Sequence, residues 1–154
     1  MAIEKVTREE REEELLQKSK LVFFIGEETL VRDIAYLLER RFFSAGILTK
    51  VIDSEILVTG ICKDCIDNKI SILERTLEIA KLFLDAGIIS ISFSSNHSIV
   101  GYNNIIETSD LILLNVDERS IKFDDSSEEV ELGQHSLEDA VHTLYKKLAT
   151  SISQ

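Results

Sequence analysis

The sequence predicts an α/β fold, a three-layer doubly wound parallel sheet of about five strands with helices on both faces. Short apolar runs typical of buried strands alternate along the chain with longer segments of helical periodicity. Strand–helix–strand units of this length connect parallel strands, and such connections are right-handed. The 154 residues are enough for one domain with a substantial core. We therefore expect an N-terminal helical arm over residues 1–20 and a single α/β domain over residues 21–154.

Apolar runs define the expected strands. These cover residues 21–25, 47–53, 88–93, 111–116 and a marginal strand near 129–132. The first run, Leu21 to Ile25, is apolar throughout and stops at Gly26, as expected for a strand buried on both faces. Ligands bind at the carboxyl ends of the strands in such sheets, so the loops after Gly26, Asp53 and Phe93 should line any site.

Apolar residues spaced three or four apart define the expected helices, which cover residues 30–45, 67–86 and 137–148. The first two end at Gly46 and Gly87, which are typical C-terminal caps, and Ser136 should cap the third. In the arm, Thr7 and Glu10 stand at capping-box spacing ahead of a highly charged run. This arm is typical of a solvated helix that needs a partner surface.

Charge and hydropathy exclude several classes of protein. The net charge of -11 repels polyanions, and no Lys/Arg cluster reverses it locally, so nucleic acid is not an expected partner. No apolar run approaches the roughly 20 residues of a membrane helix, so we expect no membrane association. The opening residues 1–20 are charged almost throughout and do not resemble a secretory signal. We therefore expect a cytoplasmic protein.

The two cysteines, Cys62 and Cys65, stand in a C-x-x-C string that allows a zinc, a redox or a plain thiol interpretation. A structural zinc site needs a second pair of ligands at defined spacing, whereas the histidines at 97, 135 and 142 are scattered singly. The pattern favours two ordinary reduced thiols, and we expect no metal site.

Six short segments, taken in their order along the chain, form a recognisable pattern. They are VTREER at 6–11, LVFF at 21–24, IAYLLERRF at 34–42, VIDSE at 51–55, a glycine at 60 and EIAKLFLDAG at 78–87. Together they resemble adenylyl-sulfate kinases, P-loop enzymes that use Mg-ATP to phosphorylate the 3′-hydroxyl of adenosine 5′-phosphosulfate. The resemblance covers nearly everything up to about Ser95 and resumes from roughly Ile105 to Leu148. It implies a P-loop NTPase-like fold.

The donor side departs from the family. A working phosphate loop reads GxxxxGK[ST], in which backbone amides surround the phosphates, the lysine neutralises them and the hydroxyl binds Mg²⁺. The interval from Gly26 to Asp33 reads GEETLVRD and keeps only the first glycine. Glu27 and Glu28 would face and repel the phosphates. The family's lysine aligns with Arg32 or with Val31, depending on where a gap is placed.

The acceptor side departs as well. Residues 54–60 align with the family's GDNxRHG string. In this sequence Glu55 keeps a carboxylate, and the arginine of the string is absent. From the family's ENIRR string, Arg75 is the one guanidinium that remains, and Ser94–Ser98 replaces ISPYR without its arginine. Residues 117–128 are much shorter than the family's nucleotide lid. Donor clamp, acceptor clamp and lid are therefore all expected to be impaired.

The resemblance implies nucleotide-binding roles for five residues and no catalytic residue. These candidates are Gly26, Arg32, Asp53, Glu55 and Arg75. The favoured function is a catalytically inactive or strongly degenerate adenylyl-sulfate-kinase-like domain with a regulatory or scaffolding role in sulfate assimilation, without a cofactor. Its expected partners are a second copy, an active kinase or the sulfurylase that makes the substrate, with an adenine nucleotide as a candidate ligand.

The alternative is an active adenylyl-sulfate kinase or related nucleotide kinase with a rebuilt phosphate loop. It would bind Mg-ATP, with Arg32 on the phosphates and Asp53 or Glu55 as a magnesium ligand or base. A purely structural interpretation competes with both functions. Glu27 and Glu28 precede a helix and would stabilise its dipole.

Overall fold

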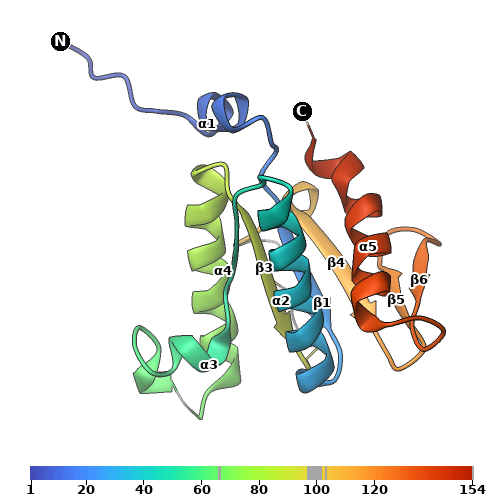
Figure 1. Cartoon of the computed structure of the whole chain (residues 1–154). Coiled ribbons are helices and arrows are strands. Elements are labelled where there is room, and N and C mark those ends of the chain that lie inside the picture. Colours follow the sequence, from blue (N-terminus) through green and yellow to red (C-terminus); the bar gives the residue numbers. More distant parts are fainter. Residues whose placement is uncertain (66, 97–101, 103, 154) are drawn as a thin grey trace.

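The computed structural model describes residues 1–65, 67–96, 102 and 104–153, and its centre is a six-stranded sheet of order β2-β3-β1-β4-β5-β6 (Figure 1). The strands are β1 (Leu21–Ile25), β2 (Thr49–Val51), β3 (Ile89–Ser94), β4 (Leu111–Val116), β5 (Ser120–Phe123) and β6 (Glu129–Glu131). The helices are α1 (Arg8–Leu15), α2 (Glu28–Ser44), α3 (Ser54–Leu57), α4 (Lys69–Asp85) and α5 (Leu137–Ile152). Two 3₁₀ turns, η1 (Lys63–Cys65) and η3 (Thr108–Asp110), complete the described elements. None of the described helices combines the length and apolarity needed to cross a bilayer.

The three-layer arrangement is confirmed. Helices α2 and α5 cover one face of the sheet and α4 covers the other (Figure 1). Neighbouring residues of β1 point to opposite faces, so Phe24 packs in the core under α2 and α5 while Phe23 packs under α4. Both rings are fully buried, which explains why this strand is apolar at every position.

The parallel sheet is extended by an antiparallel hairpin that the sequence did not predict. Strands β2, β3, β1 and β4 are parallel, whereas β4 pairs with β5 and β5 with β6 in antiparallel register. The turn before β5 depends on Asp117, whose Oδ1 accepts the N–H groups of Arg119 (2.8 Å) and Ser120 (2.9 Å). A carboxylate that bonds its own backbone in this way favours a tight reversal of the chain. The marginal fifth strand is thus the edge strand β6, and β5 was missed.

Most predicted boundaries agree with the structure, and the main exception is the second strand. Strands β1 and β4 have the predicted limits, and the predicted caps Gly46 and Gly87 both have positive φ. The second strand was expected over 47–53 but spans only Thr49–Val51. It is shorter because Asp53 already serves as the N-cap of the unpredicted helix α3.

The arm is attached to the body by polar contacts. The capping box of Thr7 and Glu10 is present, and no residue of α1 is buried. Arg8 nonetheless donates two hydrogen bonds to Asp110 (3.1 and 2.9 Å). The Gln17 side chain donates two more to backbone carbonyls of the body (2.9 and 2.8 Å). The segment expected to need a partner surface is therefore partly docked on its own domain.

Cys62 and Cys65 form a disulfide in the structure, with Cα atoms 5.5 Å apart. Both residues are buried between α3 and α4. This differs from the expectation of two reduced thiols, which rested on spacing alone and could not show that the turn brings the sulfurs together.

Gly26 is required by strand packing. A Cβ atom added there would lie 2.6 Å from the carbonyl oxygen of Val116, closer than real Cβ atoms approach any neighbour. Its N–H donates to the carbonyl of Ser94 (3.1 Å), which fixes its position between β3 and β4. The glycine that the sequence analysis aligned with a phosphate loop thus has a structural role that does not involve phosphate.

Replacing Gly26 with alanine should lower the free energy of unfolding by about 1–3 kcal/mol, because β1 and β4 must separate to admit the methyl group. Urea denaturation measures this loss. Gly60→Ala is the matched control, since a Cβ there meets nothing within 4 Å. Equal stability of the two variants would contradict the packing explanation.

Candidate functional site

Only Gly26 and Glu27 connect β1 to α2. The helix was expected to begin near Leu30 after a loop, but it begins at Glu28. The reason is the N-cap residue Glu27, whose carboxylate accepts the N–H groups of Thr29 (3.0 Å) and Leu30 (2.9 Å). Most of the residues aligned with a phosphate loop, from Glu28 onward, therefore belong to the start of a helix.

The first-turn amides of a helix lack intrahelical partners and bind anions readily. Here the anion is the carboxylate of Glu27. The hydrogen bonds from Thr29 and then Leu30 lower the pKa of Glu27 below its ordinary value. The structural interpretation of Glu27 as a helix-stabilising acid thus agrees with its geometry.

Arg32 lies at the centre of a charge cluster at the carboxyl end of the sheet. Its guanidinium nitrogens lie 3.2 Å from Glu28, 3.4 Å from Asp53 and 3.2 Å from Glu55, and its Cζ lies 5.3 Å from the Phe93 ring centroid. Burial lowers the pKa of Arg32, but the hydrogen bond to Glu28 and the interactions with Asp53 and Glu55 outweigh this and raise it. The cluster carries one positive and three negative charges.

Asp53 connects this cluster to α3. Its carboxylate is 5% exposed and accepts hydrogen bonds from the Tyr36 hydroxyl (2.9 Å) and the Glu55 N–H (2.9 Å). Burial first, and then the hydrogen bond to Asp53, raise the pKa of Tyr36 to about 12. Three predicted site residues, Arg32, Asp53 and Glu55, are thus brought together, and Asp53 also anchors the local fold.

Arg75 lies apart from that cluster. Its guanidinium donates two hydrogen bonds to Asp64 (2.6 and 3.0 Å) and one to the Ile61 carbonyl (3.1 Å). The hydrogen bond to Arg75 lowers the pKa of Asp64, and the same bond raises the pKa of Arg75. The predicted nucleotide-binding role of Arg75 therefore finds no support in its position.

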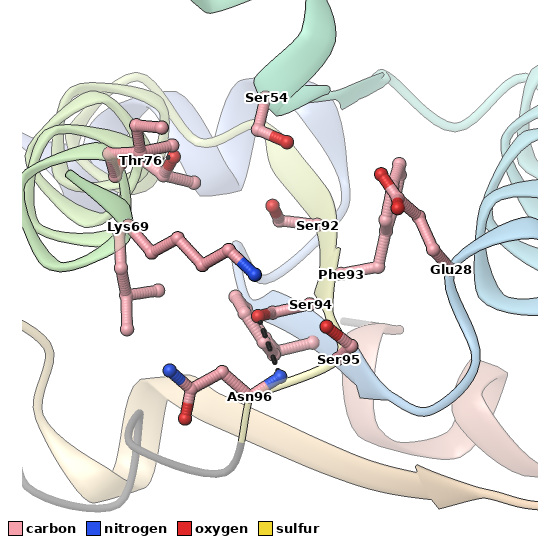
Figure 2. A pocket seen from close by; sticks show the side chains of 12 residues that line it. Glu28, Ser54, Lys69, Thr76, Ser92, Phe93, Ser94, Ser95 and Asn96 are labelled. Carbon is pink, nitrogen blue, oxygen red and sulfur yellow. Dashed lines mark hydrogen bonds between the residues drawn. The ribbon is translucent and has the colours of Figure 1, made fainter. Parts of the chain in front are cut away.

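A cavity of about 190 Å³ lies beside the cluster, between the end of β3 and the start of α4. Its polar lining comprises Glu28, Ser54, Lys69, Thr76, Ser92, Ser94, Ser95 and Asn96. Figure 2 shows the Lys69 side chain extending from α4 into the cavity, which Ser92 and Ser94 of β3 and Glu28 of α2 also line. Lys69 forms no ion pair with any described residue. The cavity thus combines several hydroxyl groups with a cation that has no ion-pair partner in the described part of the chain.

The cavity lies at the carboxyl ends of the strands, where the sequence analysis expected any site, and most of its lining residues were not among the predicted site residues. The segments after Asp53 and Phe93 line the cavity through Ser54, at the start of α3, and through Ser95 and Asn96, just after β3. Lys69 was missed because it opens a helix and belongs to no motif. Residues 97 and 98, which end the Ser94–Ser98 string, lie outside the described residues.

Curated sequence relatives are adenylyl-sulfate kinases. The chain is 34% identical over 91 residues to that of Bacteroides thetaiotaomicron, a match that covers 56% of this chain and 45% of the relative. It is 33% identical over 104 residues to that of Clostridium acetobutylicum, covering 65% and 52%. The chain thus spans about half the length of these relatives. No protein-family model matches it.

Solved structures of similar fold include the APS kinase CysC of Mycobacterium tuberculosis. A cysteine-to-alanine mutant of CysC matches with a TM-score of 0.68 at 19% identity, covering 85% of this chain and 98% of that one. CysC in complex with AMPPNP and APS matches with a TM-score of 0.58 at 21% identity, covering 65% and 63%. The chain is therefore a sequence relative of the adenylyl-sulfate kinases and has their P-loop NTPase fold.

Proposed function

We propose that this chain is a catalytically silent adenylyl-sulfate-kinase-like domain with a regulatory or scaffolding role in sulfate assimilation. One observation carries the proposal. The Glu27 carboxylate occupies the amides of Thr29 and Leu30, where a phosphate would otherwise bind. A triphosphate would have to displace this carboxylate and would then meet the charge of Glu28 as well.

The charge cluster supports the same conclusion. Phosphoryl transfer depends almost wholly on positioning and on electrostatic stabilisation of the transferred group. Arg32, the cation nearest the family's lysine position, is already paired with three carboxylates. Asp53, a candidate magnesium ligand, is already bonded by Arg32, Tyr36 and a backbone N–H.

The cavity beside the cluster supports a regulatory role. Its volume of about 190 Å³ is below the roughly 300–1,000 Å³ of typical ligand pockets. The Lys69 ammonium and the serine hydroxyls that line the same cavity suit a small oxyanion, such as free sulfate or inorganic phosphate. A domain that binds such a group without turning it over can report its concentration to a second copy, an active kinase or a sulfurylase.

The alternative, an ATP-dependent kinase with a rebuilt loop, rests on a specific observation. Arg32, Asp53 and Glu55 converge at the carboxyl edge of the sheet, where α/β proteins bind ligands. In this alternative Arg32 would bind the phosphates of Mg-ATP, and Asp53 or Glu55 would bind the magnesium ion. The ion pairs that now join these residues would have to open first.

Turnover and calorimetry separate the two functions. We expect the full chain, mixed with Mg-ATP and adenosine 5′-phosphosulfate, to form no product, and titration with ATP to release no heat of binding. An active adenylyl-sulfate kinase assayed in parallel validates the reagents. Magnesium-dependent ATP consumption that Arg32→Ala abolishes would overturn the proposal and establish the alternative.

Removing the internal anion should create an anion site. In Glu27→Ala the amides of Thr29 and Leu30 lose their partner, so the melting temperature should fall by roughly 2–4 °C. Sulfate should then stabilise the variant more than the wild type, compared with chloride at equal ionic strength. Thermal melts in both salts measure this. Glu118→Ala, at an exposed loop position, is the control and should show neither effect; an identical sulfate response in all three proteins would contradict the prediction.

The stabilisation from Glu27 should depend on pH. Its pKa is lowered from 4.5 in the folded chain, so its contribution is fully present above that value and is lost as pH falls through the lowered native pKa. Urea midpoints of wild type and Glu27→Ala should therefore differ by a constant amount above roughly pH 5.5 and converge in more acidic buffer. A difference that stays the same down to roughly pH 3 would show that the ionised carboxylate contributes nothing.

A further inference from the structure

The disulfide between Cys62 and Cys65 lies in the segment that connects α3 to α4. Backbone hydrogen bonds hold this segment at both ends. The Cys62 N–H donates to the carbonyl of Leu57, the last residue of α3 (2.8 Å), and the Asn68 N–H donates to the Cys65 carbonyl (3.0 Å). Asn68 is the N-cap of α4, so each cysteine is bonded to the helix on its own side. The disulfide thus closes a link from α3 to α4.

Arg75 of α4 places a guanidinium beside one of the two sulfurs. Its Nη1 lies 3.9 Å from the Sγ of Cys62. The same guanidinium bonds Asp64 and the Ile61 carbonyl, which hold it from both sides of Cys62. Within the described ranges no cationic side chain donates a hydrogen bond to Cys65. A cation next to a sulfur favours the thiolate, so Cys62 is the better leaving group of the pair.

The two cysteines also differ in access to solvent. Cys62 is fully buried, whereas Cys65 is 5% exposed. The two residues between them, Lys63 and Asp64, are exposed, so only a short surface turn covers the disulfide. A thiol that arrives from solvent therefore reaches Cys65 before it reaches Cys62.

We propose that Cys62 and Cys65 form a reversible redox switch that exchanges with a dithiol reductant. A thiolate of the dithiol attacks the Sγ of Cys65 and forms a mixed disulfide, while the bond to Cys62 breaks and its electron pair leaves on Cys62 as a thiolate beside Arg75. The second thiolate of the reductant then attacks its own sulfur in the mixed disulfide and releases Cys65. The chain thereby gains two electrons and the two protons that the dithiol loses, and the dithiol becomes a disulfide. A soluble disulfide reverses the exchange.

The switch is linked to the cavity at the carboxyl edge of the sheet. Ser54, the first residue of α3, and Lys69, the first residue of α4, both line that cavity. Reduction removes the cross-link from the segment between these two helices. The first turn of α4 should then open more often, and one wall of the cavity should loosen with it. This inference goes beyond the proposed function and holds whether or not the chain binds ATP or an anion.

A cycle of reduction and reoxidation tests the switch in the native full chain. Dithiothreitol reduces the chain, oxidised glutathione reoxidises it after the reductant is removed, and mass spectrometry counts the thiols that can be alkylated at each stage. Two thiols should appear and disappear together. Amide hydrogen exchange should rise severalfold on reduction at residues 58–65 and 67–72, and it should stay unchanged in β1 and α5.

Cys62→Ser/Cys65→Ser is the matched control for that cycle. It should exchange its amides like the reduced wild type and should not respond to dithiothreitol. Thiols that stay free after treatment with oxidised glutathione would overturn the proposal. So would a disulfide that is reduced only in denaturing urea, or hydrogen exchange that is the same in the reduced and oxidised chains.

The rate of reduction by dithiothreitol tests which sulfur leaves. Arg75→Gln should slow reduction by about threefold or more, because the departing Cys62 thiolate loses its cation. Arg75→Lys keeps the charge and should restore most of the rate. Asp64→Asn is the matched control, since it weakens the same contact in the turn but leaves the guanidinium beside Cys62, and it should not slow reduction.

A purely structural role for Arg75 predicts the opposite result. If the guanidinium only clamps the turn, Arg75→Gln would loosen the turn and speed reduction. A rate that rises or stays the same in Arg75→Gln would therefore overturn the assignment of Cys62 as the leaving sulfur. An Asp64→Asn variant that is reduced as slowly as Arg75→Gln would overturn it as well.

Discussion

The hydrogen bonds from the first-turn amides of α2 to Glu27 are the interaction on which the proposed function depends. The carboxylate belongs to the residue directly before the helix, so its local concentration far exceeds that of any dissolved anion. The connection between β1 and α2 is too short to rearrange into a loop, because Gly26 is packed against Val116. Part of α2 would have to unwind before a phosphate-binding loop could form. The neighbouring charges would not favour this change.

The same edge shows how residues predicted to bind a ligand can serve the fold. Arg32 on α2 reaches Asp53 at the end of β2, and Asp53 in turn caps α3. Tyr36 adds a hydrogen bond to this carboxylate from one turn further along α2. The cluster therefore joins three elements through one guanidinium and the carboxylates around it. Opening it for a substrate would leave the nearly buried charge of Asp53 without its ion pair, which is costly.

Hydropathy patterns predicted the elements that carry the core and missed those that polar groups define. Strand β1 and helix α4 follow from apolar periodicity alone, because burial selects their residues. Strand β5 and helix α3 span four residues each, too few to show a period, and they depend on turns made by Asp117 and Asp53. In the site, the segments around the cavity could be predicted, because parallel sheets bind ligands at the carboxyl ends of their strands. The pairing of Arg75 with Asp64 and the direction of the Lys69 side chain could not be predicted, because both depend on how α4 packs against the preceding turn.

The backbone amides of Thr29 and Leu30 report most directly on the central claim. Their NMR signals can be followed in the isotope-labelled full chain while Mg-ATP is added. If Glu27 holds these amides, both signals stay in place up to millimolar nucleotide. Saturable shifts of both signals, coupled to magnesium, would show that the nucleotide displaces the carboxylate and that this edge still binds phosphate.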